Sequence, residues 1–168
     1  MKKISTRLLT ALSLLAAMNV VFARFLSIQA WNVRIGFSFL PIALAGMLFG
    51  PLPAAIVGAV GDVVGAILFP TGAYFPGFTL TAFINGAIFG LCLYKKRGGL
   101  NIIAAVLLNQ IVCSLLLNSL WISVLYGSPF LPLLGTRAIQ CAIVAPVQLI
   151  TLFVLAKAYP RLKPLAVK

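Results

Sequence analysis

The sequence contains no histidine, and Asp62 is its single acidic residue against 13 lysines and arginines. These absences exclude a histidine metal site, a Ser-His-Asp triad and a catalytic pair of carboxylates. Cys92, Cys113 and Cys141 lie far apart in apolar runs, which is typical of packing residues and not of a metal or disulfide framework. No P-loop motif occurs either. We therefore expect a chain that is no enzyme and holds no metal or cofactor.

Charge of either sign is also scarce. Charged residues make up 8% of the 168 residues and hydrophobic residues 62%, whereas a soluble domain carries about 25% charged residues on its solvated surface. A soluble globular protein, a disordered chain and a nucleic-acid-binding domain are therefore excluded. An integral membrane protein remains, and at about 20 residues per span the length allows about six helices and no soluble domain.

Six apolar segments separated by glycine and proline breakers predict the membrane helices. Their expected ranges are 7–23, 35–49, 53–69, 76–94, 101–126 and 137–158. The predicted fold class is an all-α integral membrane protein, a six-transmembrane-helix bundle that forms a single domain over residues 1–168. The first segment also has the basic start and the small-x-small end of a secretory signal. We favour a membrane helix, because its removal would leave an odd number of spans.

Basic residues gather before the first segment, between the fourth and fifth, and after the sixth. They are Lys2, Lys3, Arg7, Lys95, Lys96, Arg97, Lys157, Arg161, Lys163 and Lys168. With six spans all three clusters lie on one side, which the positive-inside rule makes the cytoplasm. Both termini are therefore expected to be cytoplasmic.

Three arginines depart from this rule. Arg24, Arg34 and Arg137 fall on the outer side of the predicted topology, where no acidic residue faces them. The guanidinium group binds carboxylates through a rigid fork, so the three predict an anionic ligand in a pocket open to the outer side. The alternative is that they reach toward lipid headgroups.

Polar residues inside the helices extend the predicted pocket. Asp62 lies within the third segment, beside small residues, where it would accept N–H groups of a ligand or pair with an outer arginine. Helical spacing also predicts inward polar stripes, whose pocket members are Phe78, Asn85, Asn118 and Trp121. For the deeper Gln110 and Gln148, hydrogen bonding between helices is an equal alternative.

The loops add aromatic residues. Trp31 and Asn32 lie beside Arg34, and Tyr74 precedes the fourth segment. Such rings are commonly anchors at the membrane interface, but beside arginines they also suit a flat, anionic, heteroaromatic ligand. In the first segment, Ala11, Ser13, Ala16 and Ala17 form a small-residue patch suited to docking another membrane helix.

At these residues the chain resembles the S components of energy-coupling factor (ECF) vitamin transporters, and in particular the folate-specific group. The runs that carry the resemblance are WNVRIGFSFLP (31–41), AGMLFGP (45–51), GD (61–62), FPTGAYFPGFT (69–79), LNSLW (117–121) and YGSPF (126–130). The resemblance implies a six-helix prokaryotic plasma-membrane protein that binds folate from outside. It also implies a transmembrane T component and two cytoplasmic ATPases as partners, which hydrolyse the ATP. The family's docking motif is Ala-x-x-x-Ala, and its nearest match here is Ser13-x-x-x-Ala17.

Folate chemistry fits the candidate residues. Its carboxylates suit Arg24, Arg34 or Arg137, and the 2-amino and N3–H edge of its pterin suits Asp62, Asn85 or Asn118. Other vitamins such as riboflavin, a self-sufficient channel or permease, and a non-transporting scaffold are the alternatives.

Overall fold

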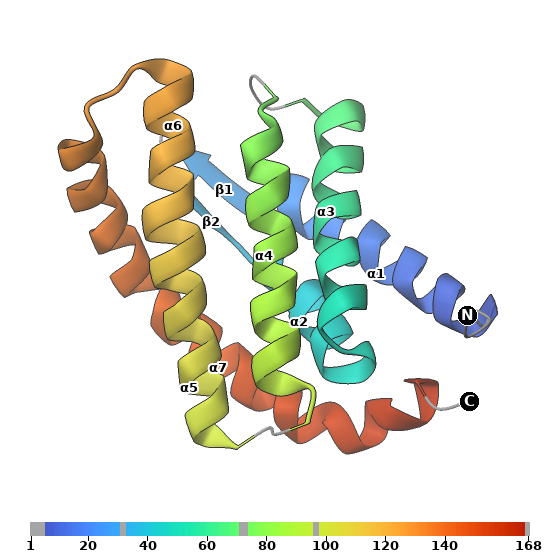
Figure 1. The fold of residues 1–168 in the computed structure, drawn as a ribbon. Helices are drawn as coiled ribbons and strands as arrows, with labels where there is room; N and C mark the ends of the chain where they lie inside the picture. Colours follow the sequence, from blue (N-terminus) through green and yellow to red (C-terminus); the bar gives the residue numbers. More distant parts are fainter. Residues whose placement is uncertain (1–5, 31–32, 71–73, 96–97, 167–168) are drawn as a thin grey trace.

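The computed structural model describes residues 6–30, 33–70, 74–95 and 98–166. Its elements, in chain order, are α1 (Thr6–Arg24), β1 (Ser27–Ala30), β2 (Val33–Gly36), α2 (Phe39–Phe49), α3 (Pro51–Leu68), α4 (Pro76–Leu93), α5 (Gly99–Leu108), the π-helix η1 (Asn109–Leu117), α6 (Asn118–Tyr126) and α7 (Phe130–Ala166). The segments α5, η1 and α6 follow one another without a break and form one long helix (Figure 1).

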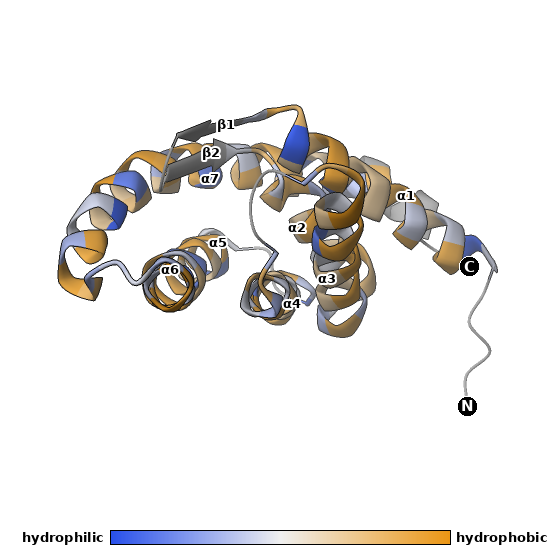
Figure 2. Cartoon of the chain, turned by 90° about the horizontal axis from the view of Figure 1, so that it is seen from above, coloured by the Kyte–Doolittle hydropathy of each residue, from blue (hydrophilic) through white to orange (hydrophobic). Residues whose placement is uncertain are grey.

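Within the described residues, five helices are long and apolar enough to cross a membrane. They are α1, α3, α4, the helix Gly99–Tyr126 and α7 over Phe130–Pro160. The apolar helix α2 is shorter, at 11 residues, and reaches about 16 Å at 1.5 Å per residue, about half of a hydrocarbon core. Most residues of the helices are apolar (Figure 2). Many large apolar side chains are exposed, among them Ile67, Leu100 and Leu131, as expected for helices in lipid.

The predicted loop between the first two helices is wrong, because the chain forms an antiparallel hairpin there. β1 pairs with β2 in the register Ser27↔Gly36 to Ala30↔Val33. The β-branched residues of this segment favour strands. The N–H and C=O groups near Ile35, where a helix was expected to begin, are part of the pairing between the two strands. α2 therefore begins only at Phe39, and β2 packs against α7.

The last helix is longer than expected at both ends. α7 begins at Phe130, and so Arg137 lies about two turns inside it instead of at its start. Pro132 does not prevent this, because proline is tolerated in the first turn of a helix, where N–H groups have no intrahelical partner. In Figure 1 the end of α7 runs across the same end of the bundle as the α4–α5 connection.

Close backbone contacts hold α2, α3 and α4 together. A Cβ on Gly86 of α4 would lie 2.6 Å from the Cα of Ala55 in α3, and one on Gly46 of α2 would lie 2.9 Å from the N of Gly90 in α4. Such distances leave no space for a side chain, so glycine permits the close packing of these helices. Beside them lies a buried core that includes Phe39, Met47, Phe89, Leu93 and Leu152.

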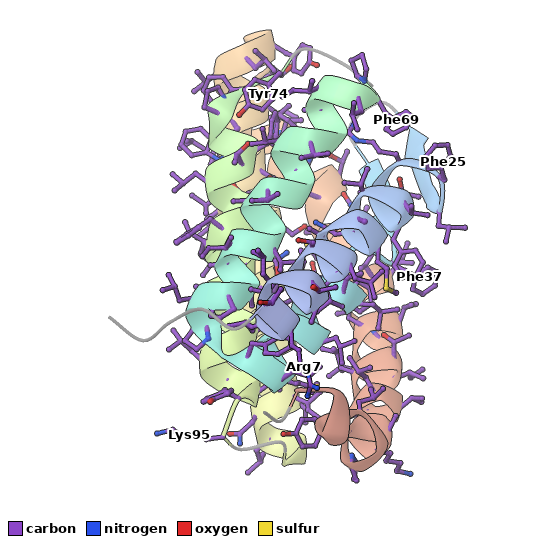
Figure 3. The ribbon with its side chains drawn as sticks, turned by 90° about the vertical axis from the view of Figure 1, so that its right-hand side faces the viewer. Arg7, Phe25, Phe37, Phe69, Tyr74 and Lys95 are labelled. Atoms are coloured by element: carbon purple, nitrogen blue, oxygen red, sulfur yellow. The ribbon has the colours of Figure 1, made fainter. Side chains whose placement is uncertain are left out.

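The two ends of the bundle differ in composition. Arg7 and Lys95 lie at one end, whereas Phe25, Phe69 and Tyr74 lie toward the other (Figure 3). The second end is called the aromatic end below. It holds the end of α1 that leads into β1, together with the α3–α4 and α6–α7 connections (Figure 1). Arg7 and Lys95 thus lie away from the aromatic end along the helix axes, whereas Arg24, the residue before Phe25, lies toward it.

Candidate functional site: a polar cavity inside the bundle

A cavity of about 390 Å³ lies between the helices. Its lining comes from α1, the end of β2, α2, α3, α4, η1, α6 and α7. It extends from Tyr74 and Tyr126 at the aromatic end inward to Asn109 and Gln148. The volume lies in the range of small-molecule sites, about 300–1,000 Å³.

Two arginines predicted for the pocket line this cavity. Arg137 is 7% exposed within α7, so it does not reach toward lipid headgroups. Arg24, at the last turn of α1, lies over α3, where a Cβ on Gly65 would stand 3.0 Å from its Nε. Two guanidinium groups from different helices therefore border one polar space, as binding of an anion requires.

Asp62 lies on the α3 wall of the same cavity. Its Oδ2 accepts a 2.8 Å hydrogen bond from Thr79 Oγ1, and that hydroxyl is 3.0 Å from the Tyr74 hydroxyl. Since Thr79 belongs to α4, this chain of contacts joins α3 to α4 and orients the carboxylate. Asp62 retains acceptor capacity for a ligand, because a carboxylate accepts about four hydrogen bonds.

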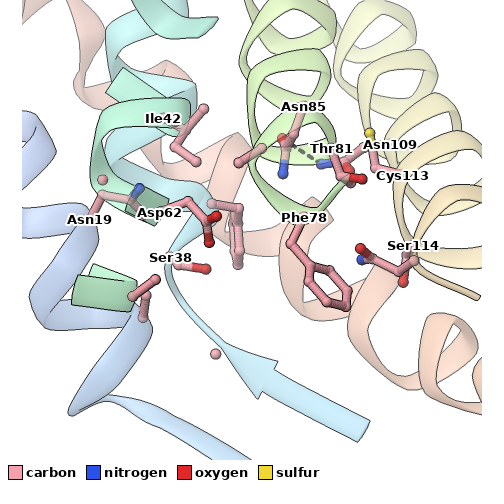
Figure 4. Close-up of a pocket in the computed structure, with 18 of the residues that line it drawn as sticks. Asn19, Ser38, Ile42, Asp62, Phe78, Thr81, Asn85, Asn109, Cys113 and Ser114 are labelled. Atoms are coloured by element: carbon pink, nitrogen blue, oxygen red, sulfur yellow. Dashed lines mark hydrogen bonds between the residues drawn. The ribbon is translucent and has the colours of Figure 1, made fainter. Parts of the chain in front are cut away.

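The inner part of the cavity is lined by side-chain amides that bond across helices. Asn109 Nδ2 donates to Asn85 Oδ1 at 3.0 Å (Figure 4), and Gln110 Nε2 donates to Gln148 Oε1 at 3.2 Å. All four residues also line the cavity. The alternative of interhelical hydrogen bonds is therefore confirmed for Gln110 and Gln148.

Aromatic rings frame the outer part of the cavity. Phe75 is extended and Pro76 occupies the first turn of α4, so the helix begins at the rim. The Phe75 ring stands 6.3 Å from Phe78 and 5.6 Å from Trp121. Tyr74, Phe75 and Phe78 line the cavity, whereas Trp121 is not among its lining residues.

The predicted stripe of the long helix holds for two of its members. Gln110 in η1 and Asn118 at the start of α6 line the cavity. Trp121 follows Asn118 by three residues within α6, so its side chain is turned about 60° around the helix from Asn118 at about 3.6 residues per turn, toward α4. There its Nε1 donates to Thr81 Oγ1 at 2.9 Å.

Several predicted residues stand elsewhere. Trp31 and Asn32 lie outside the described residues, and the description of Arg34 is limited to its backbone in β2, opposite Gln29. On α1, Ser13 and Ala17 are exposed, and Ala11 and Ala16 are half-buried. The docking role of these four residues stays a prediction.

The sequence analysis missed lining residues that include Asn19, Ser38 and Asn109. Asn19 and Asn109 are amides within apolar helices, and a polar residue inside a membrane span is itself a signal of function. Ser38 lies between β2 and α2, in the region wrongly expected to be helical.

The fold and the cavity define a multi-pass membrane protein built around a space of small-molecule size. Residues 3–161 match the family model described as ECF-type riboflavin transporter, S component. The chain belongs to this family of ECF transporter S components. The resemblance seen in the sequence is thereby confirmed, and so is the expectation of no enzyme, since the family is one of transporter subunits.

Two curated relatives share a large part of this sequence. The chain is 41% identical over 164 residues to the folate transporter FolT of Clostridium novyi (strain NT), covering 97% of this chain and 94% of that protein. It is 32% identical over 153 residues to the folate transporter FolT of Leuconostoc mesenteroides, covering 87% and 82%.

A crystal structure of FolT bound with folic acid superposes with a TM-score of 0.87 at 40% identity, covering 91% of this chain and 94% of that one. An S component for biotin superposes with a TM-score of 0.66 at 18% identity, over 92% and 95%. The latter is a likeness of fold alone.

Proposed function

We propose that this chain is the folate-binding membrane subunit of an ATP-driven vitamin importer. The observation that carries the proposal is the cavity in which Arg24 and Arg137 accompany the one carboxylate of the chain, Asp62, under a rim of aromatic rings. Folate combines the matching groups: carboxylates, a flat heterocycle and an N–H edge. The relatives named folate transporter support the same substrate.

The proposed pose follows from where these groups lie. Between Phe75 at the rim and Asn85 at the inner end, α4 rises about 15 Å at 1.5 Å per residue, so an elongated ligand fits along the bundle. The heterocycle would stack on Phe78 and Phe75, and the carboxylates would bind the guanidinium groups of Arg24 and Arg137.

The membrane arrangement is part of the proposal. We place six spans in the bilayer, with α2 as the short one, the aromatic end outside, and both termini in the cytoplasm of a prokaryotic cell. The basic residues at the Arg7 and Lys95 end support this orientation, because positive charge favours the cytoplasmic side (Figure 3).

Uptake would require partners. In this proposal a T component docks on the small-residue face of α1, around Ser13 and Ala17, and two cytoplasmic ATPases hydrolyse the ATP, so this chain itself needs no cofactor. The exposure of Ser13 and Ala17 supports a docking face there.

Two measurements test the proposal. The chain purified in detergent should bind folic acid, followed by tryptophan fluorescence, more tightly than riboflavin. In cells, labelled folate should enter only when the T component and both ATPases are co-expressed. Folate flux into liposomes that contain this chain alone would instead identify a permease, and preferential riboflavin binding would reassign the substrate.

A further inference from the structure

Asn19 is a buried amide whose hydrogen bonding is incomplete. It lies on α1, is 4% exposed and lines the cavity. Within the described part of the chain, its buried Oδ1 has no hydrogen-bond partner. A carboxamide oxygen enclosed without a donor is unfavourable, so an orientation in which a ligand donates to this oxygen would be more stable.

The surroundings place this side chain next to Asp62. A Cβ on Gly61 of α3 would stand 3.0 Å from the Asn19 Cγ and closer still to its Nδ2. Only glycine leaves room for the carboxamide there, and the next residue along α3 is Asp62, which lines the same cavity. Figure 4 shows Asn19 and Asp62 on one side of the cavity and Asn85 and Phe78 on the other.

The pair offers hydrogen-bond acceptors at neighbouring positions. Thr79 Oγ1 holds one oxygen of Asp62 in place, and the carboxylate keeps further acceptor capacity. The two ends of the Asn19 carboxamide have nearly the same shape, so a half-turn exchanges Oδ1 and Nδ2 without other movement. The oxygen then takes the place of Nδ2 beside Gly61, the residue before Asp62.

We propose that Asn19 and Asp62 form an acceptor pair that selects ligands with two adjacent N–H donors, as on the amino-pyrimidine edge of a pterin. This inference rests on the proposed folate binding and assigns Asn19 a role in its specificity. A flavin presents one N–H between two carbonyl groups, so a carbonyl oxygen would face an acceptor, and that contact is repulsive. The pair therefore favours a pterin over a flavin.

The test is a cycle of two ligands and two variants. Folic acid and its 2-deamino analogue, which lacks one donor, are titrated against the wild type, Asn19→Leu and the isosteric Asn19→Asp. The wild type should bind folic acid more tightly than the analogue. Asn19→Leu should lose about tenfold in folic acid affinity, the size of one hydrogen bond, and should bind both ligands more equally.

Two further variants serve as controls. Asn19→Asp keeps an acceptor and should retain the preference for folic acid, which separates the role of the acceptor from a loss of folding. Ser119→Ala should leave the preference unchanged, because Ser119 is fully buried and does not line the cavity.

The outcomes separate this inference from the proposed function. If the wild type binds folic acid and Asn19→Leu keeps the full preference for folic acid over the analogue, the role assigned to Asn19 is overturned. The proposed function is then unaffected. Wild type that binds no folic acid overturns both. Equalised binding by Asn19→Leu, with the preference kept by Asn19→Asp, supports the acceptor pair.

Discussion

Trp121 of α6 donates a 2.9 Å hydrogen bond from its indole Nε1 to Thr81 Oγ1 of α4. Thr81 donates in turn to the carbonyl of Gly77, one turn earlier in α4, at 3.1 Å. The indole also lies where a Cβ on Gly77 would be 2.5 Å from its Cδ2. Trp121 thus packs behind the aromatic wall of the cavity and joins two helices.

Trp121→Phe should therefore lower stability more than ligand affinity. The variant keeps an aromatic ring against Phe75 and loses the N–H donor, at a cost of about 1 kcal/mol. Thermal unfolding in detergent should show a lower midpoint, with folic acid affinity within about threefold of wild type. Phe83→Leu, at an exposed position of α4 that does not line the cavity, is the control and should change neither quantity much. A large affinity loss at unchanged stability would show that Trp121 contacts the ligand directly.

Arg137→Gln should weaken binding of ligands that carry the glutamate group. Removing one charge-assisted hydrogen bond costs about 1.5–3 kcal/mol, and about 1.4 kcal/mol is tenfold in affinity. We expect at least a tenfold loss for folic acid and a smaller loss for pteroic acid, which lacks the glutamate, by equilibrium titration. Arg7→Gln, at the opposite end of the bundle (Figure 3), should change neither. Equal losses for the two ligands would remove Arg137 from the carboxylate site.

Gly86→Ala should destabilise the contact between α3 and α4. The added Cβ would lie 2.6 Å from the Cα of Ala55, and overpacking of this kind costs about 1–3 kcal/mol. Gly135→Ala is the control, because nothing lies within 4 Å of its added Cβ, and alanine favours the helix by about 1 kcal/mol. Thermal unfolding of the two variants should shift in opposite directions. Similar midpoints would contradict the close packing of α3 on α4.

The hydrogen bond between Gln110 and Gln148 predicts a measurable coupling. Their 3.2 Å contact joins η1 to α7 at the inner part of the cavity. In a double-mutant cycle of Gln110→Leu and Gln148→Leu, the unfolding free energies should show a coupling of about 0.6–2 kcal/mol, the range for interhelical hydrogen bonds in membranes. Additive effects of the two substitutions would mean that the amides act independently.

The sequence predicted helices 53–69 and 76–94 to within a few residues of α3 (Pro51–Leu68) and α4 (Pro76–Leu93). Both lie between strong breakers, so their ends depend on neighbouring residues alone. The segment 27–36 was missed because its strands are stabilised by pairing with each other, which a search for long apolar runs does not detect. The start of α7 was missed because the last segment was expected to begin at Arg137, a charged residue, whereas the helix already runs from Phe130.

The candidate site was partly predictable. Arg24, Asp62, Tyr74, Phe78, Asn85, Asn118 and Arg137 were all named from the sequence, and all line the cavity. Asn19 and Asn109 were not, since each belongs to no stripe and a single amide in an apolar helix is easily attributed to packing. Trp121 matches the predicted stripe by its spacing, but its indole packs against α4 and not into the cavity.

The amino-acid sequence by itself determined that this chain is a membrane protein, roughly where its helices run, and that its few charged side chains inside them require partners. These properties follow from the transfer of local apolar runs into lipid, which depends on composition and length. Tertiary structure alone decided which polar groups share the cavity, that Trp121 supports the wall behind it, and that Asn19 lies beside Asp62. Those relations depend on how helices distant in sequence pack and on glycines that admit close contact.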